Sequence, residues 1–113
     1  MKGNNLGEFE ELILLTVAAL HGGAYGLAIQ KSLAAETERK VTLSAVHAAC
    51  NRLQDKGFLS ADFGAATARR GGKRKKLYTV TVRGQQAVHE AQALRMRLWR
   101  RIPPGNLQID VSW

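Results

Sequence analysis

The 113-residue sequence contains only one cysteine and three histidines, and these shortages exclude several kinds of protein. Cys50 cannot form an intramolecular disulfide, whereas small secreted domains usually contain several of them. No histidine lies at metal-ligand spacing from another histidine or from Cys50, so we expect no metal site and no cofactor. No combination of nucleophile, base and acid forms a convincing catalytic site. The sequence therefore favours a cytoplasmic protein that is not an enzyme.

Long uninterrupted apolar segments are also missing. Residues 12–30 contain no charged side chain, and this length is just sufficient to span a bilayer. A histidine and two glycines at positions 21–23 interrupt the segment, which favours two helices joined by a turn. Three glutamates precede it, where a signal peptide would need positive charge. We therefore expect neither a membrane span nor a signal peptide.

Acidic residues are scarce in the second part of the chain. The first 62 residues carry six basic and seven acidic side chains, whereas residues 63–113 carry eleven basic and two acidic ones. Six of the eight residues in 69–76 are basic, and no acid occurs between Asp62 and Glu90. A cationic cluster without interleaved acids is typical of a segment that binds a polyanion. The alternative is a loop whose charge only keeps the protein soluble, and the lack of acids favours the polyanion.

Helical periodicity predicts a first helix over residues 8–21 and a second over residues 26–38. The first is apolar almost all the way round, because Leu14 and Ala18 lie opposite the stripe that includes Phe9. Such a helix must be covered on two sides. We expect one side to face the core of the chain and the other to face a partner chain.

A third helix is predicted from Thr42, a favourable N-cap, to about Lys56, where Gly57 ends it. One face is apolar and consists of Val46, Ala49, Cys50 and Leu53. The other face is small and polar and consists of Ser44, His47, Ala48, Asn51 and Asp55. A helix that enters the DNA major groove needs such a face at its N-terminal end. Taken alone, the pattern favours an ordinary surface helix.

Two strands are predicted over residues 58–63 and 77–82, and the basic loop 64–76 joins them into a hairpin. A fourth helix follows over about residues 84–101 and ends before two prolines. Three helices followed by a basic hairpin predict a mainly α fold with a small β-hairpin, the winged helix-turn-helix. We expect a DNA-binding domain over residues 1–83, a dimerisation helix over 84–102 and a tail over 103–113.

The order and spacing of several segments resemble the PadR family of bacterial transcriptional regulators, in particular its short members with a single C-terminal helix. The matching segments are residues 6–10 with 12–20, 25–29, 42–47, 52–59, 70–78 and 81–84. Family members usually have tyrosine where this chain has His47 and leucine where it has Cys50. The first departure lies on the outer face of the third helix and the second on its apolar face.

The resemblance implies a homodimer that binds a roughly palindromic site on double-stranded DNA and represses transcription. It also implies that the C-terminal helix packs against the N-terminal helix of the partner. A flat hydrophobic small-molecule effector would bind at that interface, and Trp99 is the residue best suited to stack on it. Filling the dimer core is the favoured role of Trp99, because buried aromatic side chains usually belong to a core. The alternative functions are a winged-helix protein–protein interaction module and a non-specific nucleic-acid binder.

Two sets of site residues follow from the residue pattern and the resemblance together. The expected DNA-binding residues are Thr42, Leu43, Ser44, His47, Asn51, Arg69, Arg70, Lys73, Arg74, Lys75 and Lys76. The expected dimer-interface residues are Phe9, Leu14, Val88, Ala91, Leu94, Leu98 and Trp99.

Overall fold

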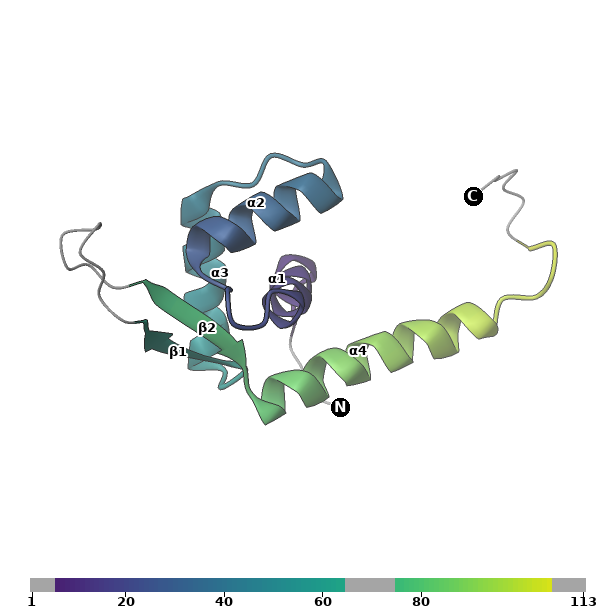
Figure 1. Ribbon diagram of the computed structural model, residues 1–113. Helices are drawn as coiled ribbons and strands as arrows, with labels where there is room; N and C mark the ends of the chain where they lie inside the picture. The colour runs from purple at the N-terminus through teal and green to yellow at the C-terminus, as the bar shows by residue number, and fades with distance from the viewer. Residues whose placement is uncertain (1–5, 65–74, 107–113) are drawn as a thin grey trace.

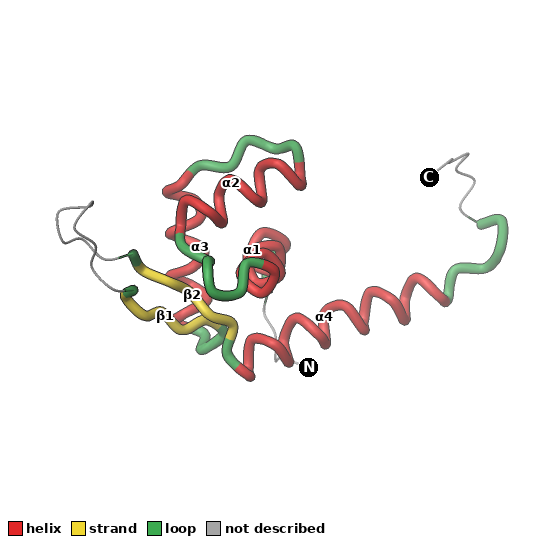
Figure 2. Tube along the Cα trace, viewed as in Figure 1, coloured by secondary structure: helices red, strands yellow, loops and turns green. Residues whose placement is uncertain are grey.

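The computed structural model describes residues 6–64 and 75–106 of the chain (Figure 1). The helices are α1 (Glu8–Ala19), α2 (Gly26–Thr37), α3 (Leu43–Asp55) and α4 (Val82–Arg100), and the strands are β1 (Leu59–Phe63) and β2 (Lys76–Val80). The strands form one antiparallel hairpin in which Leu59 pairs with Val80 and Phe63 with Lys76. The predicted mainly α fold with a small hairpin is therefore confirmed. Figure 2 shows α1, α2 and α3 grouped beside the hairpin, with α4 projecting away from them.

The core lies where the first three helices meet the hairpin. Each helix contributes one apolar face, and β2 adds Tyr78 and Val80. The fully enclosed side chains come from all three helices: Ile13, Leu14, Ile29, Val46, Ala49, Cys50 and Leu53. Burial raises the pKa of the Cys50 thiol to about 11, so it stays protonated at neutral pH and serves as a small apolar side chain.

The prediction that Leu14 faces a partner chain is wrong. Its side chain has no exposed surface, so it packs within the core of its own chain. The two apolar sides of α1 are both used internally because α2, α3 and α4 surround this helix (Figure 1). The apolar residues that α1 leaves exposed are Leu15, Ala18 and Ala19.

The junction between β2 and α4 also differs from the prediction of a strand that continues to residue 82. The strand ends at Val80, and Thr81 is the N-cap of α4. The Thr81 hydroxyl accepts a hydrogen bond from the Gly84 amide at 3.0 Å and donates one to the Gly57 carbonyl at 2.7 Å. A β-branched residue that fits a strand also fits an N-cap, and these two hydrogen bonds favour the cap.

Glycines at two positions allow the chain to fold back on itself. Gly57 has φ +80° and ends α3, as predicted. Gly84 lies directly against the Phe58 carbonyl oxygen, and any side chain there would collide with it. This contact fixes where α4 leaves the hairpin. Within residues 6–64 and 75–106, no helix is both long and apolar enough to cross a membrane.

Candidate nucleic-acid interface

The outer face of α3 presents the predicted polar side chains to solvent. Ser44, His47 and Asn51 are exposed on one side of the helix, while Val46, Ala49, Cys50 and Leu53 are buried on the other. Thr42 accepts a hydrogen bond from the Ala45 amide at 3.1 Å and so caps the helix as predicted. The N-terminal end of α3 is therefore rigid, polar and free of bulky side chains other than the partly exposed Leu43.

His47 lies over the first residue of α2. A Cβ atom placed on Gly26 would be 2.6 Å from His47 Nε2 and 3.5 Å from a methyl group of Leu43. Glycine at this position is therefore what allows the imidazole to rest against the α2 backbone. The contact limits the orientation of His47 on the outer face of α3.

The base of the basic segment lies beside the same end of α2. Tyr25 forms an isolated antiparallel bridge with Leu77, and the Tyr78 amide donates to the Ala24 carbonyl at 2.9 Å. The Lys75 ammonium is 3.9 Å from the centroid of the Tyr25 ring. Since Tyr25 and Gly26 are consecutive, Lys75 and His47 meet α2 at neighbouring residues.

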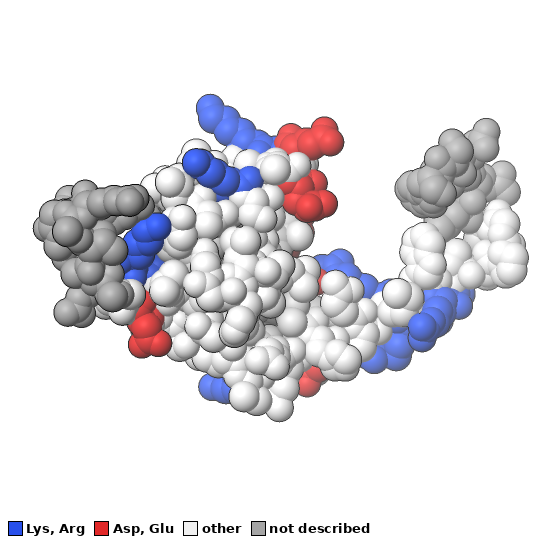
Figure 3. Space-filling view, viewed as in Figure 1, with Lys and Arg blue, Asp and Glu red and all other residues white. Residues whose placement is uncertain are grey.

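The hairpin cations that were predicted to bind DNA are only partly described. Lys76 is the first residue of β2 and Lys75 directly precedes it, whereas Arg69, Arg70, Lys73 and Arg74 lie outside the described residues. The Lys76 ammonium is 5.6 Å from the centroid of the Tyr78 ring. Figure 3 shows cationic side chains beside the hairpin and a second group along the outer half of α4. No three acidic, histidine or cysteine side chains of the described segments gather into a metal site.

A buried carboxylate on α1 holds α3 in place. The Glu10 side chain is 7% exposed and accepts hydrogen bonds from Arg52 Nε at 2.8 Å and from Lys56 Nζ at 2.7 Å. Burial alone would raise the pKa of Glu10, but the hydrogen bonds from Lys56, Arg52 and the Gly7 amide outweigh it and lower that pKa to about 2. Glu10 is therefore ionised at neutral pH and fixes the last turn of α3 against α1.

The inner half of α4 is packed and its outer half is exposed. Gly84 and Ala87 are buried, and the predicted interface residues Val88 and Ala91 are half-buried, as is Phe9 on α1. Beyond them the same face of α4 is exposed, with Leu94 at 48%, Leu98 at 50% and Trp99 at 56%. The apolar stripe thus extends past the part of the helix that this chain covers.

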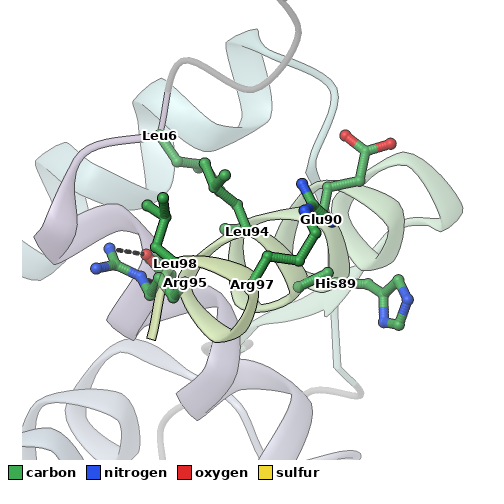
Figure 4. A pocket seen from close by; sticks show the side chains of 10 residues that line it. Leu6, His89, Glu90, Leu94, Arg95, Arg97 and Leu98 are labelled. Carbon is green, nitrogen blue, oxygen red and sulfur yellow. Dashed lines mark hydrogen bonds and ion pairs between the residues drawn. The ribbon is translucent and has the colours of Figure 1, made fainter. Parts of the chain in front are cut away.

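A groove of about 850 Å³ separates α4 from the start of the described chain (Figure 4). Leu6 and Glu11 line one side, and Ala91, Leu94 and Leu98 line the other. Across it, Arg95 donates to Glu11, with Nη2 2.8 Å from Oε1 and Nε 3.4 Å from Oε2. The groove brings together the apolar residues of α4 and the N-terminal end of α1.

Sequence reasoning missed Glu10, Tyr25 and Gly26 as parts of this interface. The spacing of Glu10 from Ile13, Leu14 and Val17 could have found the first, because it places a carboxylate on the buried side of the helix. Such an acid needs a cationic partner. The contacts of Tyr25 and Gly26 depend on how the hairpin meets α2, which the linear sequence does not contain.

Residues 14–90 match the transcriptional regulator PadR-like family, which is more than half of the chain. The chain belongs to this family. Its members are transcriptional regulators and not enzymes, as predicted. No curated protein sequence matches the chain.

Solved structures of PadR-like proteins share the fold. A PadR-like transcription factor from Bacteroides fragilis is 23% identical with a TM-score of 0.69, and 81% of this chain covers 84% of that one. A regulator from Eggerthella lenta is 24% identical with a TM-score of 0.65 and coverages of 92% and 88%. Bacillus subtilis PadR, solved in complex with operator DNA, is 23% identical with a TM-score of 0.61 and coverages of 74% and 47%.

The lowered pKa of Glu10 predicts a specific acid sensitivity. A carboxylate whose pKa falls from 4.5 to about 2 on folding stabilises the fold above pH 4.5, and this contribution is lost as the pH falls towards 2. Between about pH 5 and pH 2.5 we expect the wild type to lose about 2 kcal/mol more free energy of unfolding than Glu10→Gln. Urea denaturation followed by circular dichroism measures the difference.

The control is Glu36→Gln, which removes an exposed carboxylate of α2 and should respond to acid as the wild type does. If Glu10→Gln loses as much free energy of unfolding as the wild type, the ion pairs of Glu10 with Arg52 and Lys56 do not have this role.

Proposed function

We propose that this PadR-like regulator is a DNA-binding repressor that acts as a homodimer on a roughly palindromic promoter site. The observation that carries the proposal is that the exposed face of α3 and the base of the basic hairpin segment meet at Tyr25 and Gly26. A helix in the major groove contacts base edges with small polar side chains, while adjacent cations contact phosphates. The operator complex of Bacillus subtilis PadR supports the same class of ligand for this fold.

Direct contact with bases is assigned to Ser44, His47 and Asn51, which are exposed together on α3. Thr42 and Leu43 precede them at the helix N-terminus, where backbone amides favour phosphate. The imidazole of His47 offers a nitrogen donor or acceptor where tyrosine is usual in the family. Its place over Gly26 limits the directions in which it points and so contributes to sequence preference.

The basic segment supplies affinity that does not depend on sequence. Residues 69–76 contain six cations, namely Arg69, Arg70, Lys73, Arg74, Lys75 and Lys76. If about six cations meet phosphates, the logarithm of the binding constant should fall with the logarithm of salt concentration with a slope of roughly −5. These contacts hold the protein on DNA while α3 selects the sequence.

A second copy of the chain is the proposed occupant of the exposed stripe on α4. Leu94, Leu98 and Trp99 continue the face that is packed against α1 further back along the helix. The groove beside Leu6 is lined by the same leucines, so a partner helix that fills it would cover both surfaces. Twofold symmetry would then place two α3 helices about one turn of DNA apart.

Trp99 has two proposed roles at this interface. In a dimer its half-exposed ring would either fill the shared core or stack on a flat hydrophobic effector. Core packing is the more frequent use of a buried aromatic side chain. The effector would change the relation between the two protomers and so regulate repression.

The proposal predicts sequence-specific binding near the protein's own gene. In gel-shift titrations the wild type should prefer a dyad repeat from that upstream region over random duplex by at least about a thousandfold. A promoter fused to a reporter should lose activity when the regulator is expressed. Equal affinity for random duplex would instead support a non-specific binder, and no affinity for either would support a protein–protein interaction module.

The basic segment can be tested in the same assay. Lys75→Ala/Lys76→Ala should weaken binding to every duplex and reduce the magnitude of the salt slope by about 2. Arg100→Ala/Arg101→Ala removes equal charge from exposed positions at the end of α4 and is the matched control. An unchanged slope in the hairpin variant would show that these lysines do not contact phosphate.

The proposed dimer predicts that new negative charges on the two sides of α4 affect dimerisation differently. Leu94→Glu/Leu98→Glu should dissociate the protein into 12.4 kDa monomers, because the apolar stripe can no longer be buried. Met96→Glu changes a comparably exposed side chain outside this stripe and should leave the dimer intact. Light scattering after size exclusion measures both masses. A wild type that is monomeric at micromolar concentration would rule out the dimer.

The contact between His47 and Gly26 predicts coupled effects on sequence preference. Gly26→Ala forces the imidazole to rotate, so it should change discrimination among operator variants by roughly 1–3 kcal/mol, as expected for one lost base contact. In a His47→Ala background the same substitution should have little further effect. Gly23→Ala, whose new methyl meets nothing closer than 3.7 Å, is the control. Additive effects of Gly26→Ala and His47→Ala would show that Gly26 does not act on sequence preference through His47.

A further inference from the structure

Two consecutive carboxylates on α1 are buried and point to two different helices. Glu10 accepts hydrogen bonds from Arg52 and Lys56 in the last turn of α3, and its side chain is 7% exposed. Glu11 accepts hydrogen bonds from Arg95 in the outer half of α4, and its side chain is 8% exposed. The first turn of α1 is therefore attached by charge to both the proposed recognition helix and the proposed dimerisation helix.

The attachment to α4 matters because little else holds the outer half of that helix. In the described part of the chain, Gly84 and Ala87 are its only fully buried residues, and every residue from Leu94 to Arg100 is exposed. Among the described residues, Arg95 is the only side chain of α4 that forms an ion pair with another helix, and its partner is Glu11 on α1. Arg95 lies about two turns beyond Ala87, the last buried residue of α4. A two-hydrogen-bond arginine pair fixes both distance and direction, so it can set the angle at which α4 leaves α1.

The attachment to α3 is equally directional. Arg52 and Lys56 lie one turn apart on α3 and converge on different oxygens of the same Glu10 carboxylate. Rotation of α3 about its axis would break one of these bonds. Glu10 and Glu11 are neighbours in the first turn of α1. The ion pairs of this one turn therefore fix both the orientation of α3 and the direction of α4.

We propose that Glu10 and Glu11 are positioning residues that fix the orientation of α3 relative to α4, and thereby set the distance between DNA half-sites that the dimer accepts. This inference rests on the proposed function as a dimeric DNA-binding protein. A purely stabilising role is the competing explanation, but the side chains of Arg52 and Arg95 are 53% and 63% exposed, and ion pairs open to water contribute little to stability. In some proteins such pairs specify one geometry, and the two hydrogen bonds from Arg95 to Glu11 suit that role.

The two carboxylates should have separable effects. Loss of Glu11 frees the angle of α4 but leaves α3 and its contacts intact, so affinity for a single half-site should be unchanged. Loss of Glu10 loosens α3 itself, so affinity for a single half-site should fall. Only the Glu11 variant should alter how binding depends on half-site spacing without altering half-site affinity.

The test measures binding to duplexes in which the two half-sites are separated by one additional base pair at a time. The wild type should prefer one spacing by at least about tenfold, within the range usual for coupling between sites. Glu11→Gln should reduce that preference to less than about threefold, and Arg95→Gln, which breaks the same pair from α4, should do likewise. Glu36→Gln, an exposed charge change on α2, should retain the wild-type profile.

A distance measurement checks the geometry without DNA. Spin labels on Ala48→Cys, an exposed α3 position, report the separation of the two α3 helices in the dimer, and the enclosed Cys50 thiol is shielded from labelling. Glu11→Gln should broaden the distribution of distances while circular dichroism and dimer mass stay at wild-type values. If Glu11→Gln fails to fold, Arg95→Gln interrupts the same ion pair and supplies the result, and the reverse also holds.

The outcomes separate the two levels of the proposal. A wild type with no preferred spacing overturns the dimeric function on a palindrome, and this inference with it. A wild type with a preferred spacing that Glu11→Gln and Arg95→Gln both retain overturns only the positioning role. A Glu11→Gln or Arg95→Gln variant that loses single half-site and full-site affinity in equal proportion also overturns it, because a general loss of stability has that effect.

Discussion

The burial of one face of α3 is the constraint on which the rest of the structure depends. Val46, Ala49, Cys50 and Leu53 have no exposed surface, and they seal the space between α1, α2 and the hairpin. Because the helix repeats every 3.6 residues, enclosing these four side chains forces Ser44, His47 and Asn51 outward. The proposed DNA-contacting face is thus a consequence of the core. A core substitution that rotated α3 would move the whole set at once.

Periodicity and capping predicted this part of the molecule because both are local. The Thr42 cap, the glycine at position 57 and the two faces of α3 all depend on residues within a few turns of one another. The predicted helices therefore agree with α1, α2 and α3 to within about two residues. The strand end was less determined, since Thr81 suits both a strand and a cap, and its contact with Gly57 decides between them.

Long-range contacts account for what the sequence did not predict. Leu14 was assigned to a partner because an apolar residue on the second side of a helix does not identify which surface covers it. In this chain α4 and the hairpin complete the enclosure of α1. Likewise, Glu10 meets Arg52 across 42 positions and Glu11 meets Arg95 across 84. The placement of Tyr25 and Gly26 against Lys75 and His47 follows from the docking of the hairpin on α2.

The same pairings connect the three glutamates of α1 to cations outside the hairpin. Acids and bases in the first 62 residues nearly balance, yet the three glutamates of α1 do not neutralise the hairpin. Glu8 pairs with Arg39, Glu10 with Arg52 and Lys56, and Glu11 with Arg95. These acids are occupied by cations of α3, α4 and the loop before α3. Residues 69–76 contain six cations and no acid, a composition that suits a polyanion. The acids of α1 therefore organise the helices, whereas the positive charge of the chain is concentrated in residues 63–113.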